Sequence, residues 1–218
     1  KLSTALLSLT NLHVLRLDGT RIQWTAELTA LPLWELRIKH CKNLSSDDLQ
    51  LIGGMTSLRC LDLTDSALHV THAFNELREL NELQHLILDD TTISDAGLWP
   101  LLVTLPLIEL SLQHCTALHL TTLALLYHMT ALQSLRLAQC HVNTPLMTLM
   151  LTHLAHLTHL DVEHVNLKVT PRLVDVLTSN ATKVKLVNLK GCAMDQPHLE
   201  VLTKIATALP EYHRTVLL

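Results

Sequence analysis

The sequence is poor in the residues from which many enzyme sites are built. It has only five glycines, and it contains neither a phosphate-binding loop nor the Gly-x-Ser-x-Gly turn of hydrolases. His159 and Asp161 could form a pair, but no serine or cysteine is placed beside them as a nucleophile. We therefore expect no catalytic residue and no enzymatic activity.

A basic signature and a long apolar run are also missing. The formal net charge is −4 with neutral histidines, which does not favour a nucleic-acid partner. No apolar run reaches the roughly 18 to 20 residues that a membrane-spanning helix needs. We expect neither nucleic acid nor a membrane span. A protein partner is then the remaining expectation, and its identity is open.

Metal-binding motifs are absent although the chain has fifteen histidines. There is no His-Glu-x-x-His and no Cys-x-x-Cys. His159, Asp161 and Glu163 would share one face of a strand, where neighbours are about 6.6 to 6.8 Å apart. That spacing is too wide for one zinc ion with bonds of about 2 Å. We expect no metal and no cofactor, and leave open whether the histidines are compositional bias or a pH-sensitive surface.

What the chain does have is leucine at a fixed spacing, seen best in residues 83–98. Leu83, Leu86 and Leu88 form L-x-x-L-x-L, Thr91 follows three positions later, and Ser94 begins a predicted helix. The middle residue of this predicted strand recurs at intervals of 21 to 27 residues, at Leu15, Leu36, Leu61, Leu86, Leu110, Leu135, Leu160 and Val187. Two residues after each lies a second apolar residue, and three further on usually a cysteine, serine or threonine. One strand and one helix cannot fold alone, so the copies must stack.

This repeat resembles the leucine-rich repeat superfamily, and the recurrent cysteine resembles its cysteine-containing and ribonuclease-inhibitor-like subclass. The resemblance implies a right-handed α/β solenoid, or horseshoe, of about eight repeats, with a parallel sheet on the concave face and helices on the convex face. We expect residues 1–218 to form a single repeat domain, and a fragment of a longer protein or assembly subunit. The residues alone identify no partner.

Several local elements can be predicted from capping and breaking residues. We expect a loop or 3₁₀ turn between Ile22 and Leu31, and a ninth strand from Thr215 to Leu218. A helix should be capped by Ser45 or Ser46 and closed by Gly53-Gly54. Two further helices should begin at Thr144-Pro145 and Thr170-Pro171, where the threonine is the cap.

The cysteines favour a reducing compartment. Cys41, Cys115, Cys140 and Cys192 share one repeat phase and are predicted to be buried thiols. Cys60 lies at an outward strand position and is predicted to be more exposed. No cysteine cluster of the extracellular type is present, so we expect a cytoplasmic protein.

Function should lie on the outward strand positions of the concave face, which we expect to be free of packing. The candidate partner-binding residues are Arg16, Trp34, Arg37, Lys39, Asp62, Asp65, His85, Asp89, Asp90, Glu109, Arg136, His159, Asp161 and Glu163. The first repeats present mainly basic residues and the next mainly acidic ones. This charge pattern fits either an electrostatically complementary binding face or an ordinary solvated strand surface. Trp34 fits either an anchor for the partner or edge packing.

The favoured function is thus a non-enzymatic protein-protein interaction module. Two alternatives remain open at this point. One is the substrate-recognition arm of an F-box-type ubiquitin-ligase adaptor, for which no F-box is visible. The other is a structural subunit of a large assembly that uses its convex helices.

Overall fold

The computed structural model describes residues 8–21, 24–66, 71–179, 184–208 and 215–217. The chain forms two compact units, Lys1–Leu107 and Ile108–Leu218, which are described separately below. The expectation of one continuous domain stays a prediction. Among the described residues, no helix is both long enough and apolar enough to cross a membrane.

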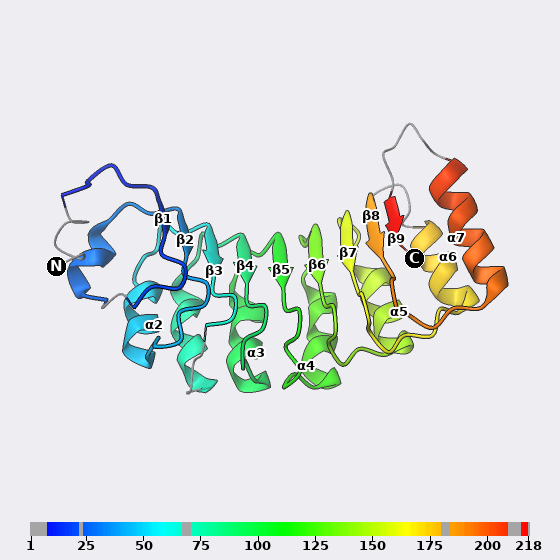
Figure 1. Ribbon diagram of the computed structural model, residues 1–218, viewed down its shortest axis with the longest axis horizontal. Coiled ribbons are helices and arrows are strands. Elements are labelled where there is room, and N and C mark those ends of the chain that lie inside the picture. The colour runs from blue at the N-terminus through cyan, green and yellow to red at the C-terminus, as the bar shows by residue number, and fades with distance from the viewer. Residues whose placement is uncertain (1–7, 22–23, 67–70, 180–183, 209–214, 218) are drawn as a thin grey trace. The chain divides into compact units, whose positions relative to one another are not determined.

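The first unit contains four parallel strands whose middle residues are the predicted leucines. They are β1 (Val14–Arg16), β2 (Glu35–Arg37), β3 (Cys60–Asp62) and β4 (His85–Ile87). The helices between and after them are η1 (Ala26–Ala30), α2 (Ser46–Gly53), η2 (Thr71–Glu79) and α3 (Asp95–Thr104), and α2 and α3 lie on the same side of the strands (Figure 1). The predicted short turn in the first repeat is the 3₁₀ helix η1.

The second unit repeats this plan with five parallel strands. They are β5 (Glu109–Ser111), β6 (Ser134–Arg136), β7 (His159–Asp161), β8 (Leu186–Asn188) and β9 (Thr215–Leu217). The helices are α4 (Leu120–Ala124), η3 (Leu125–His128), α5 (Thr144–His153), α6 (Pro171–Ser179) and α7 (Gln196–Ala208). The predicted ninth strand is confirmed at β9, which pairs with β8 in register.

The core of both units is built from the two leucine columns of the repeat. All eight predicted middle residues are buried, and each is the central residue of its strand. The second column is buried from Ile38 to Leu189, and only Leu17 is half-exposed. Fully burying each leucine stabilises the fold by about 1.5 to 3 kcal/mol, so stacking supplies the core that one repeat lacks.

The third column explains the recurrent cysteines by hydrogen bonding. Sγ of Cys41 lies 3.4 Å from the carbonyl oxygen of Leu17, in the preceding repeat, and Sγ of Cys140 lies 2.9 Å from that of Leu112. Ser66 makes the same contact to Ile38, with its hydroxyl at 2.7 Å. At these three positions, a small side chain with one donor therefore links the turn to the preceding repeat, whereas Thr20 and Thr91 donate to carbonyls of their own repeat. Burial is confirmed for Cys41, Cys115 and Cys140, but Cys192 is half-exposed, so the prediction of a fully buried thiol is wrong there.

A left-handed residue precedes this column in every repeat. The positions with positive φ are Gly19, His40, Asp65, Asp90, His114, Gln139, His164 and Gly191. Asp and His adopt this conformation more readily than most residues, which accounts for several of them. At Gly191, where φ is 73°, a β-carbon would collide with the imidazole of His164, so a larger residue would need this side chain to move.

The predicted N-cap residues agree with the structure in two of three helices. Ser45 caps α2 in a capping box with Asp48, and the hydroxyl of Thr170 accepts a hydrogen bond from the backbone N–H of Leu173 at 3.3 Å. In α5 the cap is Asn143 rather than Thr144, because its side chain accepts from the backbone N–H of Leu146 at 3.0 Å.

Candidate functional site

The open face of each unit is formed by the strand residues on either side of the buried middle residue. In the first unit, Glu35 on β2 is held by two guanidinium groups. Its Oε1 lies 2.9 Å from Nη2 of Arg16 on β1 and 2.8 Å from Nε of Arg37 on its own strand. Glu35 is only 7% exposed, so this carboxylate is a structural group and not a free one. Glu35 is in register with Val14 and Arg16 with Arg37, so Arg16 and Glu35 are diagonal neighbours that the long guanidinium side chain brings together.

Asp62 on β3 is the most buried charge of this face. Its Oδ2 lies 3.0 Å from Nζ of Lys39, and its Oδ1 accepts a hydrogen bond from the hydroxyl of Thr64 at 2.6 Å. The residue has no exposed surface. The expectation that outward strand positions are free of packing is therefore wrong at Asp62 and at Glu35. The longer basic side chains of the face cover the shorter acidic ones.

Two of the predicted acidic residues lie in turns and not on strands. Asp65 and Asp90 occupy the left-handed positions after β3 and β4, with φ of 52° and 57°. The carboxylate of Asp65 is paired with Lys42 and lies 2.9 Å from Nδ1 of His40. The hydrogen bond from Lys42, and then that from His40, lowers the pKa of Asp65 below its usual value. Asp89 is half-buried, and its carbonyl accepts the backbone N–H of Asp65 at 2.8 Å.

The second unit pairs its charges in the same way. Oε1 of Glu109 on β5 lies 2.8 Å from Nη2 of Arg136 on β6. Glu163, just after β7, accepts a hydrogen bond from Nδ2 of Asn188 at 3.1 Å, and Nζ of Lys190 lies 3.5 Å away. The bond from Asn188 contributes most to lowering the pKa of Glu163. The ion pair of Glu109 and Arg136 thus joins two neighbouring strands, and Glu163 is held by residues of the next repeat.

His159 and Asp161 each contact a group that is close by in the sequence. His159 is exposed, and its Nδ1 lies 2.8 Å from the hydroxyl of Thr158. Asp161 is half-buried, and its Oδ1 accepts the backbone N–H of Glu163 at 3.0 Å. Across the described residues, no three His, Cys, Asp or Glu side chains are grouped so that they could hold a metal ion.

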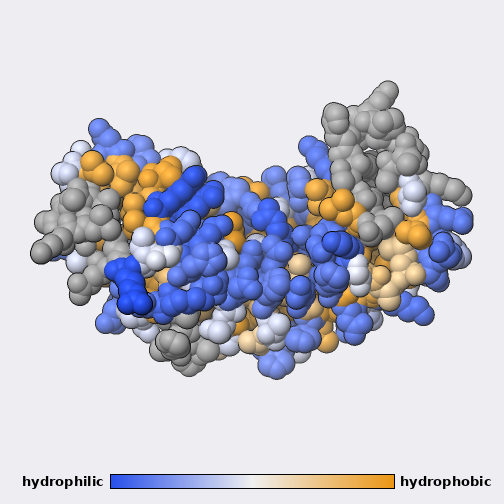
Figure 2. All heavy atoms as spheres, in the orientation of Figure 1, coloured by the Kyte–Doolittle hydropathy of each residue, from blue (hydrophilic) through white to orange (hydrophobic). Residues whose placement is uncertain are grey.

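One hollow opens near the start of the strands in the first unit. It has a volume of about 360 Å³ and is lined by Trp34, Arg59, Cys60, Gln84 and His85. We call it the Trp34 hollow. Trp34 is 44% exposed here. The visible surface over the neighbouring strands β3 and β4 is mostly hydrophilic (Figure 2).

The Trp34 hollow is held together by the backbone of three neighbouring repeats. The carbonyl of Trp34 accepts the N–H groups of Arg59 and Cys60, and the carbonyl of Arg59 accepts those of Gln84 and His85. Trp34 and His85 are among the binding residues predicted from the sequence, whereas Arg59, Cys60 and Gln84 are not. Trp34, Arg59 and Gln84 share one signal that could have found them, because each lies two residues before a middle leucine.

The sequence matches no family model and no curated protein. Solved structures are similar to this chain in fold. Internalin C2 from Listeria monocytogenes has 25% identity and a TM-score of 0.57, over 78% of this chain and 70% of that one. The internalin inlF from Listeria monocytogenes has 18% identity and a TM-score of 0.55, over 97% and 75%. The Leptospira interrogans LRR protein LIC12759 has 21% identity and a TM-score of 0.60, over 97% of this chain and 49% of its own length.

These neighbours support the leucine-rich repeat superfamily, and the cysteine-containing or ribonuclease-inhibitor-like subclass stays a prediction. Parallel strands of three residues, each with a buried central leucine or valine and followed by a left-handed turn, recur throughout the two units. The chain therefore has the α/β fold of a leucine-rich-repeat solenoid.

Proposed function

We propose that this chain is a non-enzymatic interaction module that binds another protein on the open face of its strands. The observation that carries the proposal is the Trp34 hollow. Tryptophan is enriched among the residues that dominate binding energy, provided that a partner can cover it. Trp34 is 44% exposed beside a preformed hollow, whereas Trp24 is buried in the core. The indole is thus available to a partner without rearrangement of the fold.

The charged residues of the open face have a different role in this proposal. Arg16, Arg37 and Lys39 are already paired with carboxylates of their own chain, so they produce little net field for steering. Paired charges at an interface fix register and specificity more than they add affinity. The other candidate residues of the first unit that keep exposed surface, Asp65, His85, Asp89 and Asp90, would then form the polar surround of the anchor and not its energetic centre.

We also propose that the protein works in a reducing, cytoplasmic environment. All five cysteines lie in the described residues, and each is a thiol and not half of a disulfide. Four of them serve as small donors or packing residues of the repeat, which supports a role that needs no oxidation.

The experiment compares two exposed tryptophans on different surfaces. Trp34 lines the hollow, and Trp99, on helix α3, is 52% exposed. Proteins captured by the wild-type chain from source cells are identified by mass spectrometry, and binding of each is then measured by surface plasmon resonance. We expect Trp34→Ala to raise the Kd about tenfold or more, mainly through faster dissociation. Trp99→Ala should change the Kd less than about twofold.

The same comparison can refute the proposal. If Trp99→Ala abolishes capture while Trp34→Ala has no effect, the partner binds the helix side, as a structural subunit would. If neither change affects binding, the Trp34 hollow is not the anchor.

A further inference from the structure

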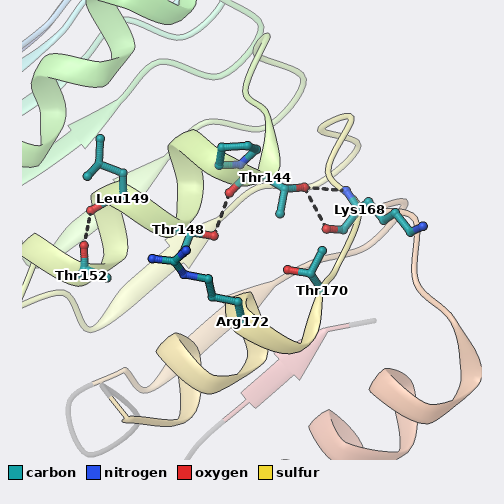
Figure 3. Close-up of a pocket in the computed structure, with 8 residues that line it drawn as sticks. Thr144, Thr148, Leu149, Thr152, Lys168, Thr170 and Arg172 are labelled. Atoms are coloured by element: carbon teal, nitrogen blue, oxygen red, sulfur yellow. Dashed lines mark hydrogen bonds between the residues drawn. The ribbon is translucent and has the colours of Figure 1, made fainter.

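A second hollow lies in the second unit, between helices α5 and α6, and we call it the α5–α6 groove. Its volume is about 640 Å³. One wall is formed by Pro145, Thr148, Leu149 and Thr152 of α5 (Figure 3). The other is formed by Lys168, which precedes α6, and by Arg172 in the first turn of α6. The groove shares no residue with the open face of the strands, so the function proposed above does not account for it.

The α5 wall behaves as an apolar surface despite its threonines. The hydroxyl of Thr148 donates to the carbonyl of Thr144 at 2.8 Å, and that of Thr152 donates to the carbonyl of Leu149 at 2.7 Å (Figure 3). Their protons are therefore used within the helix. Leu149 is 42% exposed, and α5 contains no Asp, Glu, Lys or Arg. Covering this wall removes apolar surface from water without breaking an ion pair.

The opposite wall carries two cations, Lys168 and Arg172. Within the described part of the chain, no carboxylate forms an ion pair with Lys168 or Arg172, and both residues are exposed. Most other described basic residues are paired with a carboxylate, namely Arg16, Arg37, Lys39, Lys42, Arg59, Arg78, Arg136 and Lys190. The two cations of the groove are thus available for carboxylates from outside the chain, with which they would form charge-assisted hydrogen bonds.

We propose that the α5–α6 groove binds a short segment of a partner protein in which an apolar side chain adjoins an aspartate or glutamate. The apolar side chain packs on Pro145 and Leu149, and the carboxylate pairs with Lys168 and Arg172. Charge complementarity selects an acidic segment over a basic one. The exposure of Pro145, Lys168 and Arg172 favours a peptide over a small molecule, because small-molecule sites bury most of their ligand.

The test uses peptides selected by the protein itself. A displayed library of random twelve-residue peptides is enriched on the immobilised wild-type chain and counter-selected on Arg172→Glu. Arg172 lies in the first turn of α6, where an acidic residue is favourable to a helix, so this variant should fold normally. The peptides that bind only the wild type are sequenced, and their affinity is measured by fluorescence anisotropy.

Matched variants separate the groove from general charge effects. We expect peptides rich in Asp or Glu beside Leu, Ile, Val or Phe, and a Kd raised about tenfold by Arg172→Glu or Lys168→Glu. Lys185→Glu changes an exposed cation outside the groove that has no ion pair among the described residues, and should alter the Kd less than about twofold. Thr152→Val should also leave the Kd unchanged, because its hydroxyl already donates within α5.

Each opposite result overturns the inference. Peptides that depend on Arg172 but carry no acidic residue would exclude charge recognition. An equal loss of peptide affinity with Lys185→Glu would show a general charge effect. A loss of affinity with Thr152→Val would show that the peptide forms a hydrogen bond with the α5 wall. A selection without any groove-dependent peptide would exclude the site. Trp34→Ala should not change the affinity of these peptides, so failure here is distinct from failure of the proposed function.

Discussion

Lys39, two residues after β2, forms an ion pair with Asp62 on the neighbouring strand β3, with Nζ 3.0 Å from Oδ2. The carboxylate is fully buried, whereas the side chain of Lys39 keeps one-third of its surface exposed. The negative charge of Asp62, at an outward strand position, is thus covered by the Lys39 side chain that neutralises it. The open face of the first unit is therefore part of the fold and is not a freely variable surface.

This pair predicts that charge reversal at Lys39 destabilises the fold. In Lys39→Glu, the buried Asp62 loses its cation and gains a like charge, which should lower the free energy of unfolding by about 2 to 4 kcal/mol. An outward position that is free of packing would predict almost no change. Urea unfolding followed by circular dichroism measures the difference. Lys185→Glu is the control and should stay within about 0.5 kcal/mol of wild type. Wild-type stability for Lys39→Glu would mean that the pair does not stabilise the fold.

The second prediction concerns the stability of Gly53→Ala, and its sign is opposite to that expected from helix propensity. A β-carbon at this position would collide with the backbone carbonyl of Glu76, because α2 and η2 approach closely there. Alanine normally favours a helix over glycine by about 1 kcal/mol. We expect Gly53→Ala instead to destabilise the protein by about 1 to 3 kcal/mol, since the two elements must move apart. Thermal unfolding measures the sign of the change.

Gly54 is the matched control for this prediction. It caps α2 with φ of −74°, a conformation open to any residue, so its alanine variant meets no backbone strain. Gly54→Ala should therefore cost less than Gly53→Ala. A stabilising effect of Gly53→Ala would show that the two elements can separate without loss.

The sequence predicted the core of this protein well because its signal is local. Each middle leucine is set by a short spacing that fixes the buried face of a strand, and every one of these positions is buried as expected. The cap at Ser45 and the strand from Thr215 also follow from local patterns. Asn143 and Thr144 are both favourable N-cap residues, and the predicted cap of α5 was wrong by one residue.

The candidate sites were less predictable because they depend on contacts between repeats. Asp62 is buried beside Lys39 of the preceding repeat, and the residues of β3 alone do not indicate this contact. The lining of the Trp34 hollow by Arg59 and Gln84 requires the register of three strands at once. The α5–α6 groove depends on how two helices pack, which the repeat pattern does not specify.

The thiols predict an order of chemical reactivity. Cys60 is half-exposed and lines the Trp34 hollow, so it should be alkylated first. Cys192 is also half-exposed, but burial raises the pKa of its thiol, which lowers the fraction of reactive thiolate at neutral pH. Cys115 and Cys140 should be protected until the protein unfolds. Iodoacetamide labelling followed by peptide mass spectrometry gives the order.

A pH series strengthens this test. Labelling of Cys192 should rise at a higher pH than labelling of an ordinary thiol, because its thiolate forms later. Rapid labelling of Cys115 and Cys140 in the native protein would contradict the buried assignment of the repeat cysteines.

The pairing of Asp65 predicts how stability depends on acid. Lys42, and then His40, lowers the pKa of Asp65, so its contribution to stability is present above the unfolded pKa of about 3.9 and is lost as the pH falls through the lower folded value. In Lys42→Met the pKa should move back toward its ordinary value. The stability difference between wild type and Lys42→Met should then be largest near neutral pH and shrink below pH of about 4. Urea unfolding between acidic and neutral pH, with the Asp65 carboxyl titrated by NMR, measures both quantities. A difference that stays constant across this range would show that the Lys42–Asp65 contact does not bias the protonation of Asp65.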